Sequence, residues 1–157
     1  MSDLKQEVRN IIKKNMWLVV STVNEHGQPH SCVVVYQSDG DTIIALTGKD
    51  TIKAKNIQKN PKVSITIPFR MNLLHKLVPA PPAELHFYAT AEILSKEDGD
   101  ARRIYGKFLK HAESSGVAED SVFIKIKPLK TIHTFGVGIK MWEMRNPNKA
   151  RNKIFLE

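Results

Sequence analysis

Residues 17–67 read WLVVSTVNEHGQPHSCVVVYQSDGDTIIALTGKDTIKAKNIQKNPKVSITI, and this stretch decides the fold. Short runs rich in Val, Ile and Thr alternate with glycine-containing turns at residues 25–27 (EHG) and 38–41 (SDGD). Short strands joined by tight turns are typical of an antiparallel meander. The pattern therefore predicts strands at residues 16–24, 29–36, 42–46 and 62–67.

The remainder of the chain continues this pattern and adds helices. An apolar stripe that includes Leu4 and Val8 predicts an N-terminal helix, and Asp98 is a suitable cap for a second amphipathic helix. Further strands are expected at residues 84–94, 121–128 and 129–136. We therefore expect one domain over residues 1–157, mainly β with flanking helices, built as a small six-stranded barrel.

Two segments are less regular. Residues 68–83 (PFRMNLLHKLVPAPPA) end in a proline cluster and are expected to form a long excursion, with a short helix at residues 71–77. Connections this long are often functional or part of an interface. The tail after Gly138 is expected to be basic and irregular.

The composition restricts the class of protein. The 157 residues are 41% apolar and 25% charged, include one cysteine, and carry a net charge of +8. The N-terminus lacks the apolar core of a signal peptide, and no apolar run approaches the ~20 residues needed to span a bilayer. We expect a soluble cytoplasmic protein without an internal disulfide. The positive charge favours nucleic acid, an anionic membrane or a phosphorylated small molecule as a partner, without choosing among them.

Several kinds of chemistry are disfavoured. Gly48-Lys49 does not belong to a P-loop, because that motif needs Gly at position 43 and Ser or Thr at position 50, where the chain has Ile43 and Asp50. The six histidines are scattered, and no pair has a spacing typical of zinc sites, so no metal is expected. Cys32 lies among valines, as expected for a buried and inert thiol.

Residues 47–61 (TGKDTIKAKNIQKNP) contain an unusual helix start. Thr51 can cap a short helix that Asn60-Pro61 ends, yet its first turns carry Lys53 and Lys55, with Lys49 just before them. The N-terminus of a helix is already positive, and negative groups are favoured there. Backbone N–H groups, the Thr51 hydroxyl and two lysines can together form a phosphate cradle. The alternative is that all of these lysines simply face water.

The order of these elements resembles the pyridoxamine 5'-phosphate oxidase-like family of FMN-binding split-barrel proteins. The similarity is carried by residues 17–67, with Gly27, Pro29 and Thr47-Gly48 in matching places, and continues more loosely through ELHFYATAEIL and VFIKIKPLKTI. It implies a six-stranded antiparallel Greek-key split barrel. It also implies a homodimer with FMN bound between the subunits.

The resemblance further implies which residues hold the cofactor. The strand around Cys32, Val33 and Val34 would face the isoalloxazine ring, and Leu46 and Thr47 would line the ribityl chain. The phosphate would be held by Thr51 and Lys53, with Lys49 adding charge. A polar residue reaching the flavin would be Glu84, and residues crossing from the partner subunit would be Trp142 and Arg145.

The chain also departs from the true oxidases of this family. They carry arginines where this chain has Cys32 and Ile52, and a C-terminal Arg-x-His substrate motif that neither His133 nor the residues around Trp142 reproduce. We therefore expect an FMN-dependent oxidoreductase acting on another small molecule or on an electron donor such as a reduced nicotinamide. The alternatives are a split barrel that uses a deazaflavin or haem, and a basic barrel that binds nucleic acid.

Overall fold

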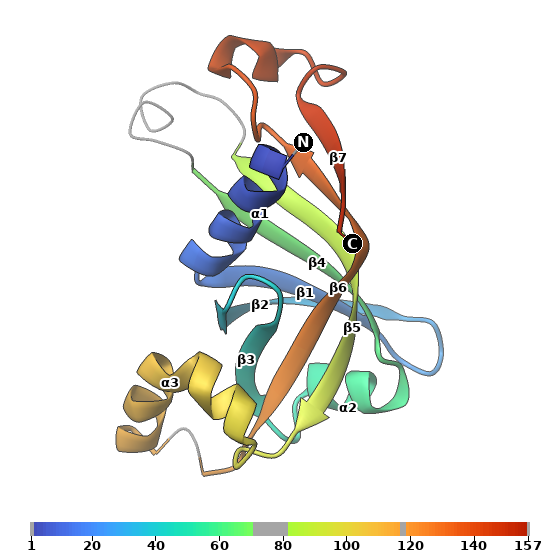
Figure 1. Cartoon of the computed structure of the whole chain (residues 1–157). Helices are drawn as coiled ribbons and strands as arrows, with labels where there is room; N and C mark the ends of the chain where they lie inside the picture. The colour runs from blue at the N-terminus through green and yellow to red at the C-terminus, as the bar shows by residue number, and fades with distance from the viewer. Residues whose placement is uncertain (1, 71–81, 117–118, 157) are drawn as a thin grey trace.

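The structure is a computed structural model and describes residues 2–70, 82–116 and 119–156 (Figure 1). Its strands pair antiparallel in the order β3-β2-β1-β4-β5-β6-β7, and an additional pairing of β3 with β6 closes β1 to β6 into a barrel. The strands are β1 (Trp17–Val23), β2 (Pro29–Ser38), β3 (Ile43–Gly48), β4 (Lys62–Phe69), β5 (Ala83–Leu94), β6 (Ser121–Phe135) and β7 (Arg151–Phe155).

The connection between β3 and β4 gives the barrel its Greek-key topology. After the β1-β2-β3 meander the chain returns so that β4 pairs with β1, with Val20 opposite Ile65. The resulting spatial order β4-β1-β2-β3 is that of a Greek key. The predicted fold class, a six-stranded antiparallel split barrel with flanking helices, is confirmed.

Within the described residues, four helices flank the barrel: α1 (Ser2–Lys14), α2 (Ile52–Lys59), α3 (Gly99–Ser114) and the 3-10 helix η2 (Met141–Arg145). Figure 1 shows α2 and α3 at the lower end of the barrel and η2 at the opposite end. The predicted start of α3 is confirmed, because the Asp98 carboxylate accepts a hydrogen bond from the Ala101 N–H at 2.9 Å. No helix among the described residues is long and apolar enough to cross a membrane.

Two predictions about the C-terminal region are wrong. The strands expected at residues 121–128 and 129–136 form one continuous strand, β6. Pro128 lies where the pairing of β5 with β6 shifts register, an irregularity at which a residue without an N–H is tolerated, so the strand continues through it. The tail, expected to be irregular, forms η2 and then β7, which pairs with β6 outside the closed barrel. The short helix expected at residues 71–77 lies outside the described residues.

Apolar side chains that alternate along the strands fill the barrel. Val20, Ile65 and Phe87 are fully buried, and full burial of a side chain of this size stabilises a fold by roughly 1.5–3 kcal/mol. Helix α1 adds Ile12 to this core, and the Tyr36 hydroxyl donates a hydrogen bond to the Ile12 carbonyl at 2.9 Å. Burial also raises the pKa of Tyr36, which keeps this phenol neutral.

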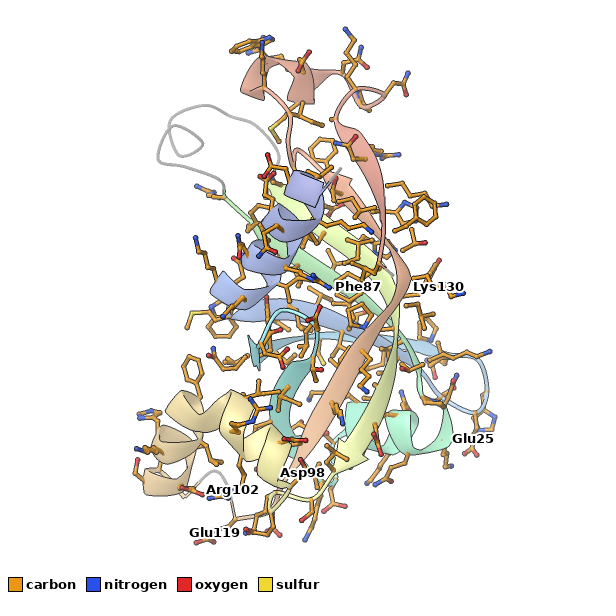
Figure 2. All side chains as sticks on the ribbon, in the orientation of Figure 1. Glu25, Phe87, Asp98, Arg102, Glu119 and Lys130 are labelled. Carbon is orange, nitrogen blue, oxygen red and sulfur yellow. The ribbon has the colours of Figure 1, made fainter. Side chains whose placement is uncertain are left out.

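A second apolar cluster attaches α3 to the outer side of β3 and β6. Tyr105 and Leu109 of α3 pack with Ile44 and Phe123, and the rings of Tyr105 and Phe123 meet edge to face at 5.7 Å. Arg102 and Glu113, two polar residues of the same helix, form an ion pair at 3.0 Å. Figure 2 shows Arg102 close to Asp98 and Glu119 at this end of the molecule. This packing places α3 beside the end of β3, where the candidate site lies.

Candidate cofactor site

A groove of about 500 Å³ lies between β2, the end of β3 and the helices α2 and α3. Trp17, Val33 and Leu46 give it an apolar wall, and Tyr105 borders it from α3. Trp17 and Val33 are 52% and 62% exposed, which is unusual for large apolar side chains on a strand. Ligand pockets are typically ~300–1,000 Å³ and mostly apolar with a few polar groups, so a flavin-sized ligand fits this groove.

The polar end of the groove lies where β3 passes into α2. Thr47 and Lys53 line it, and Thr51 caps the helix. The Thr51 hydroxyl oxygen accepts a hydrogen bond from the Ala54 N–H at 3.4 Å. The same hydroxyl donates to the Gly48 carbonyl at 2.9 Å, and it lies 3.3 Å from the Thr47 hydroxyl. The hydroxyl groups of Thr47 and Thr51 therefore meet at the N-terminus of α2.

The lysines around α2 differ in their partners. Lys49 Nζ lies 2.6 Å from Asp120 Oδ1, and Lys59 Nζ lies 2.9 Å from Glu25 Oε2, whose position beside α2 is labelled in Figure 2. Lys55 Nζ lies 3.9 Å from Asp50 Oδ1. Lys53 has no carboxylate partner among the residues that the structure describes. It is also the one lysine of α2 that lines the groove.

The pair of Lys49 and Asp120 affects the ionisation of both groups. Its hydrogen bond raises the pKa of Lys49 and lowers the pKa of Asp120, and the Coulomb attraction between the charges acts in the same direction. The Lys49 N–H also donates to the Asp120 carbonyl at 2.9 Å. Lys49 thus already has a carboxylate partner at the surface, whereas Lys53 has none among the described residues and lines the groove.

A buried polar contact holds α2 on the barrel. Asn56 and Thr22 are 7% and 0% exposed, and Asn56 Nδ2 donates to Thr22 Oγ1 at 3.0 Å. Ala54 and Ile57 are buried on the same side of the helix. These contacts fix the direction of α2, so that its first turn borders the groove.

The structure brings together five of the ten residues predicted to bind the cofactor. The five that line the groove are Val33, Val34, Leu46, Thr47 and Lys53.

Five other predicted residues do not line the groove. Thr51 lies one hydrogen bond away from it, Lys49 is paired with Asp120, and Cys32 is half-buried and packs against the barrel core. Glu84 lies at the start of β5, opposite Phe135. Trp142 lies on η2, at the far end of the barrel from α2 (Figure 1).

Seven of the twelve residues that line the groove were not predicted to bind the cofactor, and Tyr105, Trp17 and Asp120 are three of them. Tyr105 lies in the amphipathic helix predicted after Asp98, and Trp17 lies in the strand predicted at residues 16–24. Asp120 reaches the groove because β3 pairs with β6, with Gly48 opposite Ser121. That long-range register has no signal in the local sequence. The position of Asp120 just before the strand predicted at residues 121–128 is the one local hint that it lies near this end of the barrel.

Another hollow, of about 570 Å³, lies between α1 and the end of β4. Its lining includes the carboxylates of Asp3 and Glu7 together with Lys14 and Arg70. In this hollow two carboxylates balance two cations, whereas the groove beside α2 has Lys53 without a carboxylate partner among the described residues, next to the start of a helix. The groove beside α2 is therefore the better candidate for a phosphorylated cofactor.

The fold and the groove define a split-barrel protein with a cofactor-sized surface site. The sequence matches the pyridoxamine 5'-phosphate oxidase family over residues 4–135, and the chain belongs to this family. It is 37% identical over 65 residues to General stress protein 26 of Bacillus subtilis (strain 168), a match that covers 41% of this chain and 46% of that protein. The chain thus matches less than half the length of this relative.

Solved structures show the same fold at low sequence identity. HutZ, the haem storage protein from Vibrio cholerae, superposes with a TM-score of 0.69 at 17% identity, covering 86% of this chain and 96% of HutZ. An FAD-binding protein from Mesorhizobium loti superposes with a TM-score of 0.62 at 15% identity, covering 79% of this chain and 88% of that protein. Flavin and haem proteins therefore share this architecture, and the cofactor must be argued from the groove itself.

Proposed function

We propose that this chain is an FMN-binding flavoprotein that acts as an oxidoreductase, with the cofactor in the groove beside α2. One observation carries the proposal. Residues 49–59 contain four lysines, and Lys53 is the one that has no carboxylate partner in the described part of the chain. Lys53 is also the one that lines the groove. A helix N-terminus and a lysine together favour a phosphate. The FMN phosphate would accept hydrogen bonds from Lys53, from Thr51 or Thr47, and from the first N–H groups of α2.

The apolar part of the groove suits a flat ring. Val33 and Trp17 expose apolar surface on the outer face of β2 and β1, and Leu46 lies between them and the polar end. These side chains would orient the ring and exclude water from one of its faces. When bound, FMN supplies the hydride and electron chemistry, so the protein needs no acid–base pair of its own. A reduced nicotinamide and a small-molecule acceptor are the proposed reaction partners.

Haem fits the groove less well than flavin. Haem iron is held by His, Cys, Met or Tyr side chains. The described residues that line the groove include no His, Cys or Met. Tyr105 is the only phenol there, and burial raises its pKa, so it stays protonated and is a poor ligand. Haem bound in this groove would therefore lack an axial ligand, whereas FMN would use the apolar wall, Lys53 and the start of α2.

We further propose that the chain acts as a homodimer. A second copy would cover the exposed Trp17 and Val33 and complete the ring site, which the groove of one chain leaves open on one side. Trp142 and Arg145 lie on η2, at the far end from this chain's own groove, so they can contact a flavin only in the partner subunit. Light scattering of the flavin-loaded protein should give the mass of a dimer, and a monomer at micromolar concentration would refute this arrangement.

The substrate is proposed to differ from that of the true oxidases. The residues around His133 and Trp142 lack the Arg-x-His pattern of the true oxidases. Cys32 and Ile52 stand where those oxidases carry arginines. We therefore expect no useful oxidation of pyridoxamine 5'-phosphate in a standard aerobic assay. Efficient turnover of that compound would show that another part of the chain supplies the missing anion site.

The visible spectrum of the purified protein tests the cofactor directly. Flavin absorbance and fluorescence are expected, and their release on denaturation should yield FMN. A haem Soret band or a deazaflavin spectrum would instead identify an alternative cofactor. A colourless protein that binds neither added FMN nor riboflavin would reject the flavoprotein proposal.

A further inference from the structure

Two histidines far apart in the sequence are neighbours on the outer face of the sheet. His86 of β5 and His133 of β6 are directly opposite each other in the antiparallel register. Residues in this relation have Cβ atoms roughly 4.5–5.5 Å apart and project to the same face. His86 is half-buried and His133 is exposed, so both imidazoles are accessible on the same outer face of the sheet.

The ring of His86 is held by its neighbours. Thr66 of β4 is its partner on the other side, and the Thr66 hydroxyl lies 3.3 Å from His86 Nδ1. Tyr88 contacts the same ring edge to face, with centroids 5.8 Å apart. A hydrogen bond at one ring nitrogen of a histidine fixes the ring and leaves the other nitrogen for a metal. Here that nitrogen is His86 Nε2.

We propose that His86 and His133 bind a divalent transition-metal ion, with His86 Nε2 and one ring nitrogen of His133 as the two protein ligands. Imidazole pairs suit Cu²⁺, Ni²⁺ and Zn²⁺, and affinity generally peaks at Cu²⁺. The described residues contain no group of three His, Cys, Asp or Glu side chains that could hold a metal. Water or an external ligand therefore completes the coordination, and the site keeps open positions.

The surroundings affect the strength of this site. Lys153 of β7 is the register partner of His133 on its other side, and its positive charge opposes a metal ion. Its ammonium group lies 5.1 Å from the ring centroid of Phe155, on its own strand. Neither histidine lines the groove beside α2, and β5 is three strands away from β2 in the sheet. The metal site is therefore independent of the proposed flavin site.

Titration of the tag-free full chain with CuCl₂, followed by calorimetry, tests the proposal. His133→Ala and His86→Ala should each lower Cu²⁺ affinity about tenfold or more, because even outer-shell changes cost ~10–100-fold at metal sites. His111→Ala, which removes an exposed histidine of α3, is the matched control and should leave the affinity unchanged. The electron paramagnetic resonance spectrum of bound Cu²⁺ should show imidazole nitrogen coupling that His133→Ala weakens.

Several results would each overturn the proposal. They are no saturable Cu²⁺ binding to the wild-type chain, unchanged affinity in a folded His133→Ala variant, and an equal loss of affinity in the His111→Ala control. His133 is exposed on its strand, so its removal should not prevent folding. Lys153→Ala gives an opposite test, because removing the adjacent cation should raise the affinity, and a loss in this variant would also contradict the site.

Discussion

The N-termini of α2 and α3 solve the same electrostatic problem in different ways. Helix α3 has Asp98 as its cap and Asp100 in its first turn, so negative charge from the chain itself meets the helix dipole. Helix α2 has Thr51 as its cap, no acidic residue in its first turn, and Lys53 beside the groove. The start of α3 is thus compensated by carboxylates of this chain, whereas the start of α2 is not, and this is why we propose that a phosphate binds there.

The attachment of the two helices differs as well. Helix α3 is held by apolar packing of residues such as Tyr105, while α2 adds a buried hydrogen bond from Asn56 to Thr22 to its own apolar packing. A hydrogen bond constrains direction more strictly than apolar contact does. The helix that borders the candidate phosphate site is therefore also the one with the more directional attachment.

The largest effect on stability is expected from breaking that attachment. Asn56→Ala leaves the buried Thr22 hydroxyl without its donor, and this should lower the free energy of unfolding by about 1–3 kcal/mol. Gln58→Ala, on the exposed side of the same helix, is the control and should change stability little. Urea denaturation followed by circular dichroism measures both. Equal stability of the two variants would mean that the hydrogen bond does not hold α2.

A smaller effect is expected from removing either cap. Thr51→Ala and Asp98→Ala should each destabilise the protein by about 1 kcal/mol, because each leaves helix N–H groups without an acceptor. The two variants should differ in ligand binding, with Thr51→Ala weakening FMN and Asp98→Ala leaving it unchanged. Fluorescence titration with FMN separates them. Weaker FMN binding in both variants would remove the distinction between the two helix ends.

The smallest effect is expected at the exposed pair of Lys49 and Asp120. The pKa of Asp120 is lowered in the folded state, so its stabilisation is present at neutral pH and is lost as pH falls through that lowered pKa. The pKa of Lys49 is raised, so the stabilisation disappears again at strongly alkaline pH. Asp120→Asn should therefore cost slight stability at pH 7 and none in acid, as thermal unfolding at both pH values can show. A larger loss in acid would contradict this assignment.

Much of the fold could be predicted from local sequence. The bounds of α2 follow from Thr51 and from Asn60-Pro61, and the meander follows from its turns. The continuity of β6 could not be predicted, because a proline within a strand usually marks an end and only the shifted register with β5 accommodates Pro128. Strand β7 was missed because its basic residues resemble a solvated tail, and pairing with β6 is what orders them.

Only part of the candidate site could be predicted, namely the part formed by residues close together in the sequence. Val33, Leu46 and Lys53 lie in the stretch that carries the family resemblance, and the structure places them in one groove. Asp120 reaches the groove through the pairing of β3 with β6, and Tyr105 through the packing of α3 on these strands, and no local sequence pattern encodes either contact. The partner of Lys49 could not be foreseen either, since Asp120 is far away in the sequence and near only after β3 pairs with β6.

The most direct test of the account compares FMN and riboflavin binding in Lys53→Ala. A hydrogen bond to a charged group contributes roughly 1.5–3 kcal/mol, so FMN affinity should fall about 10- to 150-fold. Riboflavin has the same ring without the phosphate, and its affinity should hardly change. Lys55→Ala, whose lysine lies 3.9 Å from Asp50, is the matched control and should leave both ligands unaffected. An equal loss of affinity for FMN and riboflavin, or no loss for either, would contradict the claim that Lys53 binds the phosphate of FMN.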